Sequence, residues 1–206
     1  MVQGRHAQGE ADMRHLLAAT ALAACLHGPA AAQGRKVPIP GDALQEQDPA
    51  GTALVEAFGL FCLKGFPGAA RMEDAAPGRL TPMTPAQVES YLHGDPGRGW
   101  TYAADGGTYV LTVEDPPYHT CAVRRSYATP PRYRLPWLLT TQLWAAAAGR
   151  GPFQDAKPEV MRQNGLLIEA VARLLPGEGG DVFMELKTTY PDGHFEQRLA
   201  RRAIGR

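Results

Sequence analysis

The stretch DVFMELKTTYPDGHFEQRLARRA, residues 181–203, decides the fold class. The Pro-Asp-Gly sequence at 191–193 is typical of a hairpin turn. Apolar residues recur at even spacing on both sides of it, namely Val182, Met184 and Leu186 before the turn and Phe195, Leu199 and Ala203 after it. Because side chains two apart in a strand point to the same face, this pattern predicts an antiparallel β-hairpin.

Further segments with strand-like patterns extend the hairpin into a sheet. The pattern of residues 165–175 (GLLIEAVARLL) fits either a helix or a strand, and we predict a third antiparallel strand because a hairpin alone is only marginally stable. Residues 100–103 and 108–114 flank an Asp-Gly-Gly turn and predict a second hairpin. One more strand follows Pro117, and in it Cys121 and Val123 are expected to share a face with His119.

Three segments have helical patterns. Residues 52–64 are apolar around most of the helical circumference, with Thr52 as a candidate N-cap. A second helix begins after Thr84, with Pro85 at its first position, and ends near Gly94. A third is predicted over residues 136–148. Since helices and strands do not alternate regularly, we expect an α+β fold in which an antiparallel sheet of about five to six strands packs with two or three helices and holds one disulfide.

The N-terminus is typical of a secretory signal peptide. The basic Met13-Arg14-His15 precedes the apolar run 16–26, and Ala30 and Ala32 provide small side chains before Gln33. This predicts a signal peptide over residues 1–32, with Met13 as a second candidate start, and export to the periplasm or the medium. A membrane-spanning helix needs roughly 20 apolar residues, so no transmembrane segment is predicted. Residues 33–51 are expected to be a flexible lead-in to a single domain, residues 52–206.

The same apolar run permits a different interpretation. Leu22-Ala23-Ala24-Cys25 is similar to the lipobox of bacterial lipoproteins, in which the cysteine is acylated after cleavage. On that hypothesis the mature chain is anchored to the envelope by lipid at Cys25.

Cysteine usage agrees with export. Once Cys25 is removed or acylated, Cys62 and Cys121 remain, and such a pair in an oxidising compartment predicts a disulfide. Closing the intervening loop is worth roughly 4 kcal/mol in the chain-entropy model. Two buried free thiols are the alternative.

Composition argues against several classes of function. Lys+Arg and Asp+Glu both number 21, giving a formal net charge of zero, which disfavours binding to nucleic acid. After the signal peptide, serine occurs as Ser90 and Ser126, and neither lies in a Gly-x-Ser-x-Gly elbow. The chain has no His-Glu-x-x-His sequence, no phosphate-binding loop and no paired Cys/His spacing for zinc. We therefore expect no metal and no cofactor.

Isolated titratable residues leave one enzymatic alternative open. We interpret His93 as a helix C-terminal residue, His194 as a turn residue and His119 as half-buried beside Cys121. Paired carboxylates could instead serve a small envelope hydrolase, with candidates at Glu73, Asp74, Asp95, Asp105, Glu114 and Asp115.

The main binding candidate is the segment RRSYATPPRYR, residues 124–134, which contains no acidic residue. Arginine binds phosphate or carboxylate in bidentate geometry, and tyrosine offers a flat apolar face beside it. Its candidate binding residues are Arg124, Arg125, Tyr127, Arg132, Tyr133 and Arg134. The alternative is a strand edge followed by a solvated loop.

A second basic cluster lies on the last strand and tail. Its members are Arg198, Arg201, Arg202 and Arg206. Glu185 and Glu196 are available for cross-strand pairing with part of it.

Short motifs give the mature chain a resemblance to uncharacterised exported proteins of proteobacteria. The motifs are Phe61-Cys62 within residues 52–64, Gly99-Trp100, the Asp-Gly-Gly turn at 105–107, Val110-Leu111 and Cys121-Ala122-Val123. The resemblance implies a periplasmic or lipid-anchored domain with a Cys62–Cys121 bridge. Together these observations predict a non-catalytic envelope domain that binds a protein or a cell-wall component.

Overall fold

The computed structural model describes residues 49–104, 107–128, 137–177 and 179–204. The predicted signal peptide and residues 33–48 of the predicted lead-in lie outside these ranges. Residues 49–51 already belong to the first helix, so that helix begins three residues before Thr52.

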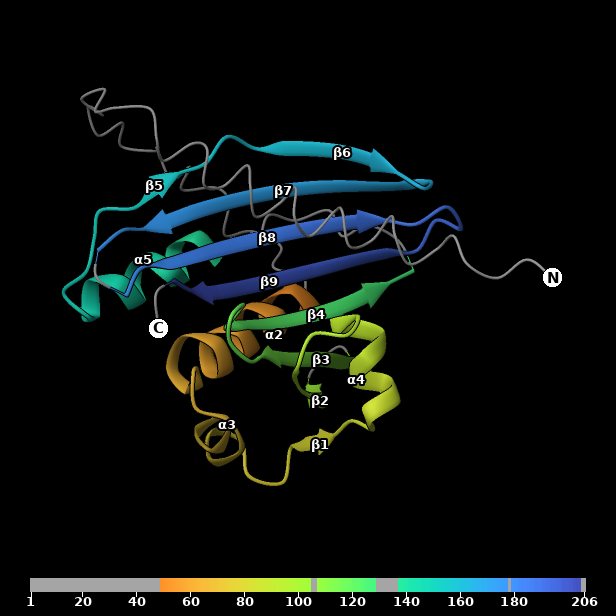
Figure 1. Ribbon diagram of the computed structural model, residues 1–206, viewed down its shortest axis with the longest axis horizontal. Helices are drawn as coiled ribbons and strands as arrows, with labels where there is room; N and C mark the ends of the chain where they lie inside the picture. Colours follow the sequence, from red (N-terminus) through yellow and green to blue (C-terminus); the bar gives the residue numbers. More distant parts are fainter. Residues whose placement is uncertain (1–48, 105–106, 129–136, 178, 205–206) are drawn as a thin grey trace. The chain divides into compact units, whose positions relative to one another are not determined.

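One antiparallel sheet organises the described chain (Figure 1). Its strands follow the order β1-β2-β3-β4-β9-β8-β7-β5, and β6 pairs with β7 beside β5. Their bounds are β1 Leu80–Pro82, β2 Gly97–Ala104, β3 Gly107–Glu114, β4 Thr120–Tyr127, β5 Gln154–Asp155, β6 Glu159–Gln163, β7 Leu166–Leu175, β8 Asp181–Thr189 and β9 Phe195–Ala203.

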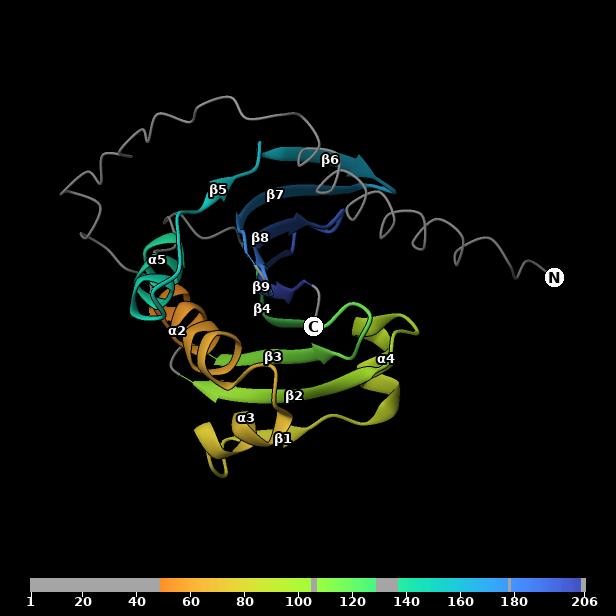
Figure 2. The ribbon, with the colours of Figure 1, turned by 60° about the vertical axis from the view of Figure 1, so that its left-hand side comes forward.

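The helices cover the sheet from two sides (Figure 2). They are α2 Pro49–Ala57, its π-helical continuation η2 Phe58–Gly65, α3 Ala69–Ala75, α4 Pro85–Leu92 and α5 Trp137–Ala147. We call the side of the sheet that carries α2, η2 and α5 the helix face, and the opposite side, where α4 packs on β2 and β3, the outer face.

The main core lies on the helix face. Tyr109 and Leu111 of β3, Leu199 of β9 and Phe61 of η2 are all inaccessible to solvent. The apolar circumference of residues 52–64 is needed because this helix packs in the middle of the core, between the sheet and α3. Its end fits closely there, since a Cβ on Gly65 would lie 3.1 Å from Cγ of Met72.

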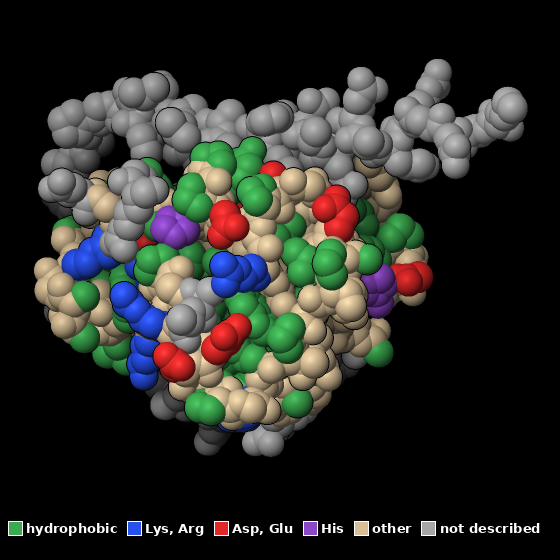
Figure 3. Space-filling view, turned by 60° about the horizontal axis from the view of Figure 1, so that its bottom comes forward, with side chains coloured by type: hydrophobic (Ala, Val, Ile, Leu, Met, Phe, Trp, Pro, Cys, Tyr) green, Lys and Arg blue, Asp and Glu red, His purple; other side chains and the backbone are tan. Residues whose placement is uncertain are grey.

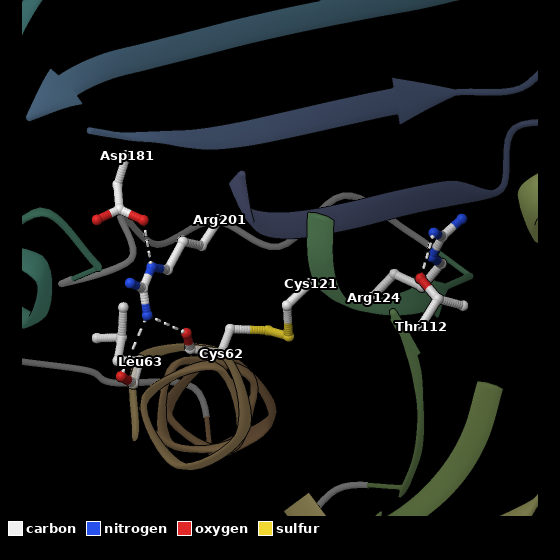
Figure 4. The surroundings of a disulfide bond; sticks show 7 residues. All are labelled: Cys62, Leu63, Thr112, Cys121, Arg124, Asp181 and Arg201. Carbon is white, nitrogen blue, oxygen red and sulfur yellow. Dashed lines mark hydrogen bonds and ion pairs between the residues drawn. A yellow bond between two sulfur atoms is a disulfide. The ribbon is translucent and has the colours of Figure 1, made fainter. Parts of the chain in front are cut away.

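A disulfide between Cys62 of η2 and Cys121 of β4 joins this helix to the sheet (Figure 4). The two Cα atoms are 5.4 Å apart, and both side chains are buried. The predicted pairing is therefore present in the structure.

The prediction of an antiparallel sheet packed with helices is confirmed, but its strand count was too low. The described sheet has nine strands rather than five to six. The missed strands, β1, β5 and β6, lie at the two edges of the sheet, are two to five residues long and lack alternating apolar residues. The short helix α3 was also missed, so the helices exceed the two or three expected.

Two local predictions need correction. His119 does not share the alternation of β4, because it precedes the strand with a left-handed φ of 41°. The helix predicted over residues 136–148 ends one residue earlier, since α5 ends at Ala147, and its buried side chains are Trp137, Thr141 and Ala145. Within the described ranges, every helix is too short or too polar to cross a bilayer.

Candidate anion-binding site

Strand alternation divides the predicted arginine-tyrosine segment between the two faces of the sheet. Arg124 and Arg125 are consecutive in β4, so Arg124 points to the outer face and Arg125 to the helix face. Arg132, Tyr133 and Arg134 lie outside the described residues. The segment is therefore not one continuous binding surface within the described chain.

Arg125 and Tyr127 belong to the packing of the helix face. Nη1 of Arg125 donates a hydrogen bond of 2.7 Å to the hydroxyl of Tyr109. Its guanidinium carbon lies 5.1 Å from the centre of that ring and 5.0 Å from the centre of the Tyr127 ring. Tyr127 packs in turn against Phe195, at 6.1 Å between ring centres. These contacts give both residues a structural role.

Arg124 has a different environment (Figure 4). It is only 6% exposed, although it carries a charge. Its Nη2 donates a hydrogen bond of 3.1 Å to Oγ1 of Thr112, and its guanidinium lies over the ring of Tyr91 in α4, at 4.8 Å from the ring centre. Its Nε is buried and has no hydrogen-bond partner. A buried donor without an acceptor is costly, so an acceptor that reached this atom would stabilise it.

A second arginine lies directly beside it. The register of β4 and β9 places Arg198 opposite Arg124, on the same outer face. Like charges directly opposite each other in a sheet are destabilising. Among the described residues, no ion pair joins either arginine to an Asp or Glu. We call these two residues the arginine pair.

Ionisable groups around the arginine pair do not remove its charge. Burial lowers the pKa of Arg124 to about 10, with a further contribution from Arg198, so the guanidinium remains protonated at neutral pH. The charge of Glu196 acts in the opposite direction and raises the pKa of Arg124. Burial, followed by the charge of Glu196, raises the pKa of Tyr190, whose hydroxyl therefore stays a hydrogen-bond donor well above neutral pH. The site holds positive charge and donors together.

The second predicted basic cluster is also divided between the two faces. Arg201 lies on the helix face, where its Nε donates to Asp181 at 2.8 Å and its Nη1 to the carbonyl of Cys62 at 3.0 Å (Figure 4). Arg150 donates to the other oxygen of Asp181 at 2.6 Å. Of this cluster, Arg201 is thus paired within the protein. Arg202 lies on the outer face over Tyr118, and Arg206 is outside the described residues.

The expected carboxylate partners behave differently from the prediction. Glu185 accepts hydrogen bonds of 2.6 Å from Trp137 and from Gln197, and it pairs with Lys187 rather than with an arginine of β9. Its role is to satisfy polar groups under α5.

The histidines lie on separate elements. His93 follows α4 with a left-handed φ of 51°, and His194 follows the β8–β9 turn, where its ring stacks on Tyr190. Both agree with their predicted positions. The ring of His119 lies 4.8 Å from that of Phe66, and its Nδ1 is buried without a partner. No group of three His, Cys, Asp or Glu side chains in the described ranges is placed to hold a metal ion.

The candidate carboxylates lie on exposed or partly exposed positions where described. Glu73 and Asp74 are exposed on α3, Asp115 is exposed after β3, and Asp95 and Glu114 are partly exposed beside β2 and β3. Asp105 is outside the described residues. On the face shown in Figure 3, acidic and basic side chains lie among apolar ones, in keeping with the zero net charge.

The sequence pointed to Arg124 and to Arg198 but assigned them to different clusters. Their pairing depends on the register of β4 against β9, which alternation within either strand does not specify. Tyr91, Thr112 and Tyr190 were not predicted as site residues for the same reason. The chain matches no model of a known protein family, and no curated protein matches it significantly.

Proposed function

We propose that this protein is an exported, non-catalytic envelope domain that binds a protein or cell-wall component by an anionic group held at the arginine pair. The observation that carries the proposal is that Arg124 is buried and charged, faces Arg198, and forms no ion pair with a described carboxylate.

Energetics support this assignment. Taking a charge out of water without a partner is costly, and the cost is offset when an opposite charge and hydrogen-bond acceptors are supplied. An oxyanion on a ligand supplies both. It would accept hydrogen bonds from the free Nε of Arg124 and from Arg198, and it would remove the repulsion between the two arginines.

Export to the periplasm or the medium is part of the proposal. The Cys62–Cys121 bridge supports it, because disulfides persist in oxidising compartments. The predicted signal sequence supports the same location, and the lipobox-like sequence at Cys25 supports a lipid-anchored variant of it.

Binding to isolated envelope fractions tests the proposal. Arg124→Gln and Arg198→Gln keep most of the side-chain volume but remove the charge, and each is expected to weaken binding by about tenfold or more, the usual effect of losing a charge-assisted hydrogen bond. Arg202→Gln is the matched control, because Arg202 lies on the same strand and face but over Tyr118. Binding by both pair variants equal to that of the parent would refute the proposal.

The same material tests the enzymatic alternative. Release of soluble fragments from purified wall polymer, abolished by Glu114→Gln or Asp95→Asn, would support a hydrolase with paired carboxylates instead.

A further inference from the structure

The exposed side of α5 is apolar and uncharged. The helix contains no Asp, Glu, Lys or Arg, and it packs on the core through the buried Trp137, Thr141 and Ala145. At 3.6 residues per turn, its exposed positions form one continuous arc on the opposite side. The arc consists of Leu138, Leu139, Gln142, Leu143, Ala146 and Ala147. We call this arc the leucine surface, because its three leucines are 41%, 42% and 63% exposed in chain order.

The other described helices present charged residues to solvent. Glu56 and Lys64 are exposed on α2 and η2, Glu73 and Asp74 on α3, and Glu89 on α4. In contrast, three of the five large apolar side chains exposed in the described chain lie on α5. A helix that is apolar on its outer side as well as its inner side is normally covered on both, so the leucine surface indicates a binding partner.

We infer that the leucine surface rests on the lipid bilayer of the envelope. The inference depends on the envelope location in the proposed function but not on the arginine pair. Figure 2 shows α5 at the edge of the described elements, beside α2. A helix of 11 residues is too short to cross a bilayer, which takes roughly 20. The helix therefore lies in the plane of the membrane, with its leucines among the acyl chains and its buried side still on the sheet.

The N-terminal part of the chain supports this occupant. In the lipid-anchored form of the proposed function, residues 26–48 connect the acylated Cys25 to α2, and such a segment spans at most about 80 Å. The chain then continues from α2 into η2, on which α5 packs. A single acyl chain binds membranes only marginally, and stable attachment takes a second contact. The leucine surface would supply that contact close to the tethered end of the domain.

A second copy of the chain fits this surface less well. The surface belongs to one helix, whereas a stable interface uses roughly 20–30 residues on each partner. Anionic headgroups are not the main attraction either, because the leucine surface has no charge, and Arg150, which follows the helix, is paired with Asp181. Binding should therefore depend little on anionic lipid or on salt.

Flotation with lipid vesicles tests the inference. The exported chain carrying Cys25→Ser, which removes the acylation site, is mixed with vesicles of phosphatidylcholine, with and without phosphatidylglycerol. We expect binding to both that agrees within about twofold and persists at high salt. Brominated phosphatidylcholine should quench tryptophan fluorescence at short range, because Trp137 and Trp144 lie on α5.

Variants assign the binding to α5. Leu139→Gln combined with Leu143→Gln should weaken vesicle binding by about tenfold, since the exposed parts of the two side chains together amount to about one leucine. Gln142→Leu, within the same arc, should strengthen it by about threefold or more. Val160→Gln is the matched control, because Val160 is 65% exposed on the edge strand β6. Far-ultraviolet circular dichroism checks that each variant is folded.

The contrary outcomes are distinct. Equal binding by the parent and the double leucine variant, or binding that requires phosphatidylglycerol and Arg124, overturns the inference. A dimer in sedimentation that the double leucine variant dissociates assigns the surface to a second copy and also overturns it. Absence of vesicle binding, with envelope binding that still depends on Arg124 and Arg198, refutes this inference but not the proposed function. Vesicle binding through α5, with envelope binding insensitive to both arginine variants, does the reverse.

Discussion

Arg124 and Arg201 show how the surroundings of one residue type decide its role. Both guanidiniums are buried, but Arg201 has Asp181 and two backbone carbonyls as acceptors, while Arg124 has one threonine hydroxyl and a tyrosine ring. The charge of Arg201 is thus satisfied within the fold, whereas that of Arg124 is stabilised only in part. Loss of the Arg124 charge is therefore expected to raise the free energy of unfolding, and disruption of the Arg201 pair to lower it.

We expect Arg124→Met to stabilise the protein while abolishing anion binding. The folded-state pKa of Arg124 is below its ordinary value, so the cost of burying its charge is complete below a pH of about 10 and is lost as the pH rises beyond that. An apolar side chain of similar length avoids this cost; replacing a buried ion pair by apolar residues stabilises proteins by about 1–4 kcal/mol, and we expect a gain of that order here.

Urea unfolding at neutral pH, with and without added phosphate, measures both effects. Phosphate should stabilise the parent in proportion to its occupancy of the site and should not affect the variant. An Arg124→Met protein that is less stable than the parent would mean that the contacts of Arg124 with Thr112 and Tyr91 already offset the cost of burying its charge.

Replacement of Asp181 should lower the free energy of unfolding, in contrast to Arg124→Met, which should raise it. Asp181→Asn removes the negative charge shared by Arg150 and Arg201, which lie 2.6 and 2.8 Å from its two oxygens. Leaving buried arginine charge uncompensated costs about 3–5 kcal/mol. Asp155→Asn is the control, because Asp155 is 63% exposed where it pairs with Arg173, and exposed ion pairs contribute about 0–1 kcal/mol. Equal losses in urea unfolding for the two variants would contradict this account.

At the scale of single elements, local signals explain which parts could be predicted. The helix α4 follows its signals closely, with Thr84 as N-cap, Pro85 at its first position and a left-handed His93 at its end. The strands β3 and β9 carry alternating apolar residues because one side of each is in the core, whereas the alternating Val182, Met184 and Leu186 of β8 lie on the outer face. β1, β5 and β6 form through pairing with a neighbouring strand at a sheet edge, so their own residues need no such pattern.

The cap of α4 gives a prediction at this scale. The amide of Gln87 donates to Oγ1 of Thr84 at 3.4 Å, and the amide of Thr84 donates to the side chain of Gln87 at 2.9 Å. Thr84→Ala should lower the free energy of unfolding by about 1 kcal/mol. Ser90→Ala is the control within the same helix, because its hydroxyl only donates to the carbonyl of Gln87. A thermal-denaturation midpoint that shifts equally in both variants would show that the cap contributes nothing of its own.

At the scale of the whole molecule, the candidate site depends on contacts that no local pattern encodes. Tyr91, Thr112, Arg124 and Arg198 come from α4, β3, β4 and β9, and only the order of the strands brings them together. Sequence periodicity could predict that each strand exists and which residues share a face. It could not predict that β4 pairs with β9. The turns specify the pairing of strands within each hairpin, but not which strands of two separate hairpins lie side by side.

Removal of the disulfide tests whether the arginine pair on the outer face depends on the helix packing on the opposite face. The Cys62–Cys121 bridge anchors η2 to the middle of the sheet on the helix face, whereas the arginine pair lies on the outer face. Cys62→Ser combined with Cys121→Ser should therefore lower the free energy of unfolding by roughly 4 kcal/mol, through the greater freedom of the unfolded chain. Arg201 still donates to the carbonyls of Cys62 and Leu63, so η2 should keep its position in the folded variant.

Two measurements on the same samples check this expectation. Urea unfolding with and without dithiothreitol should shift the parent toward the double variant and leave the variant unchanged, because only the parent has a bridge to reduce. Titration with phosphate in the absence of urea should give the same affinity for both proteins, because the arginine pair does not contact the bridge. A parent that is insensitive to the reductant would show that the two thiols are free in solution. Loss of phosphate binding in the folded double variant would show that the outer face depends on the helix packed against the other side of the sheet.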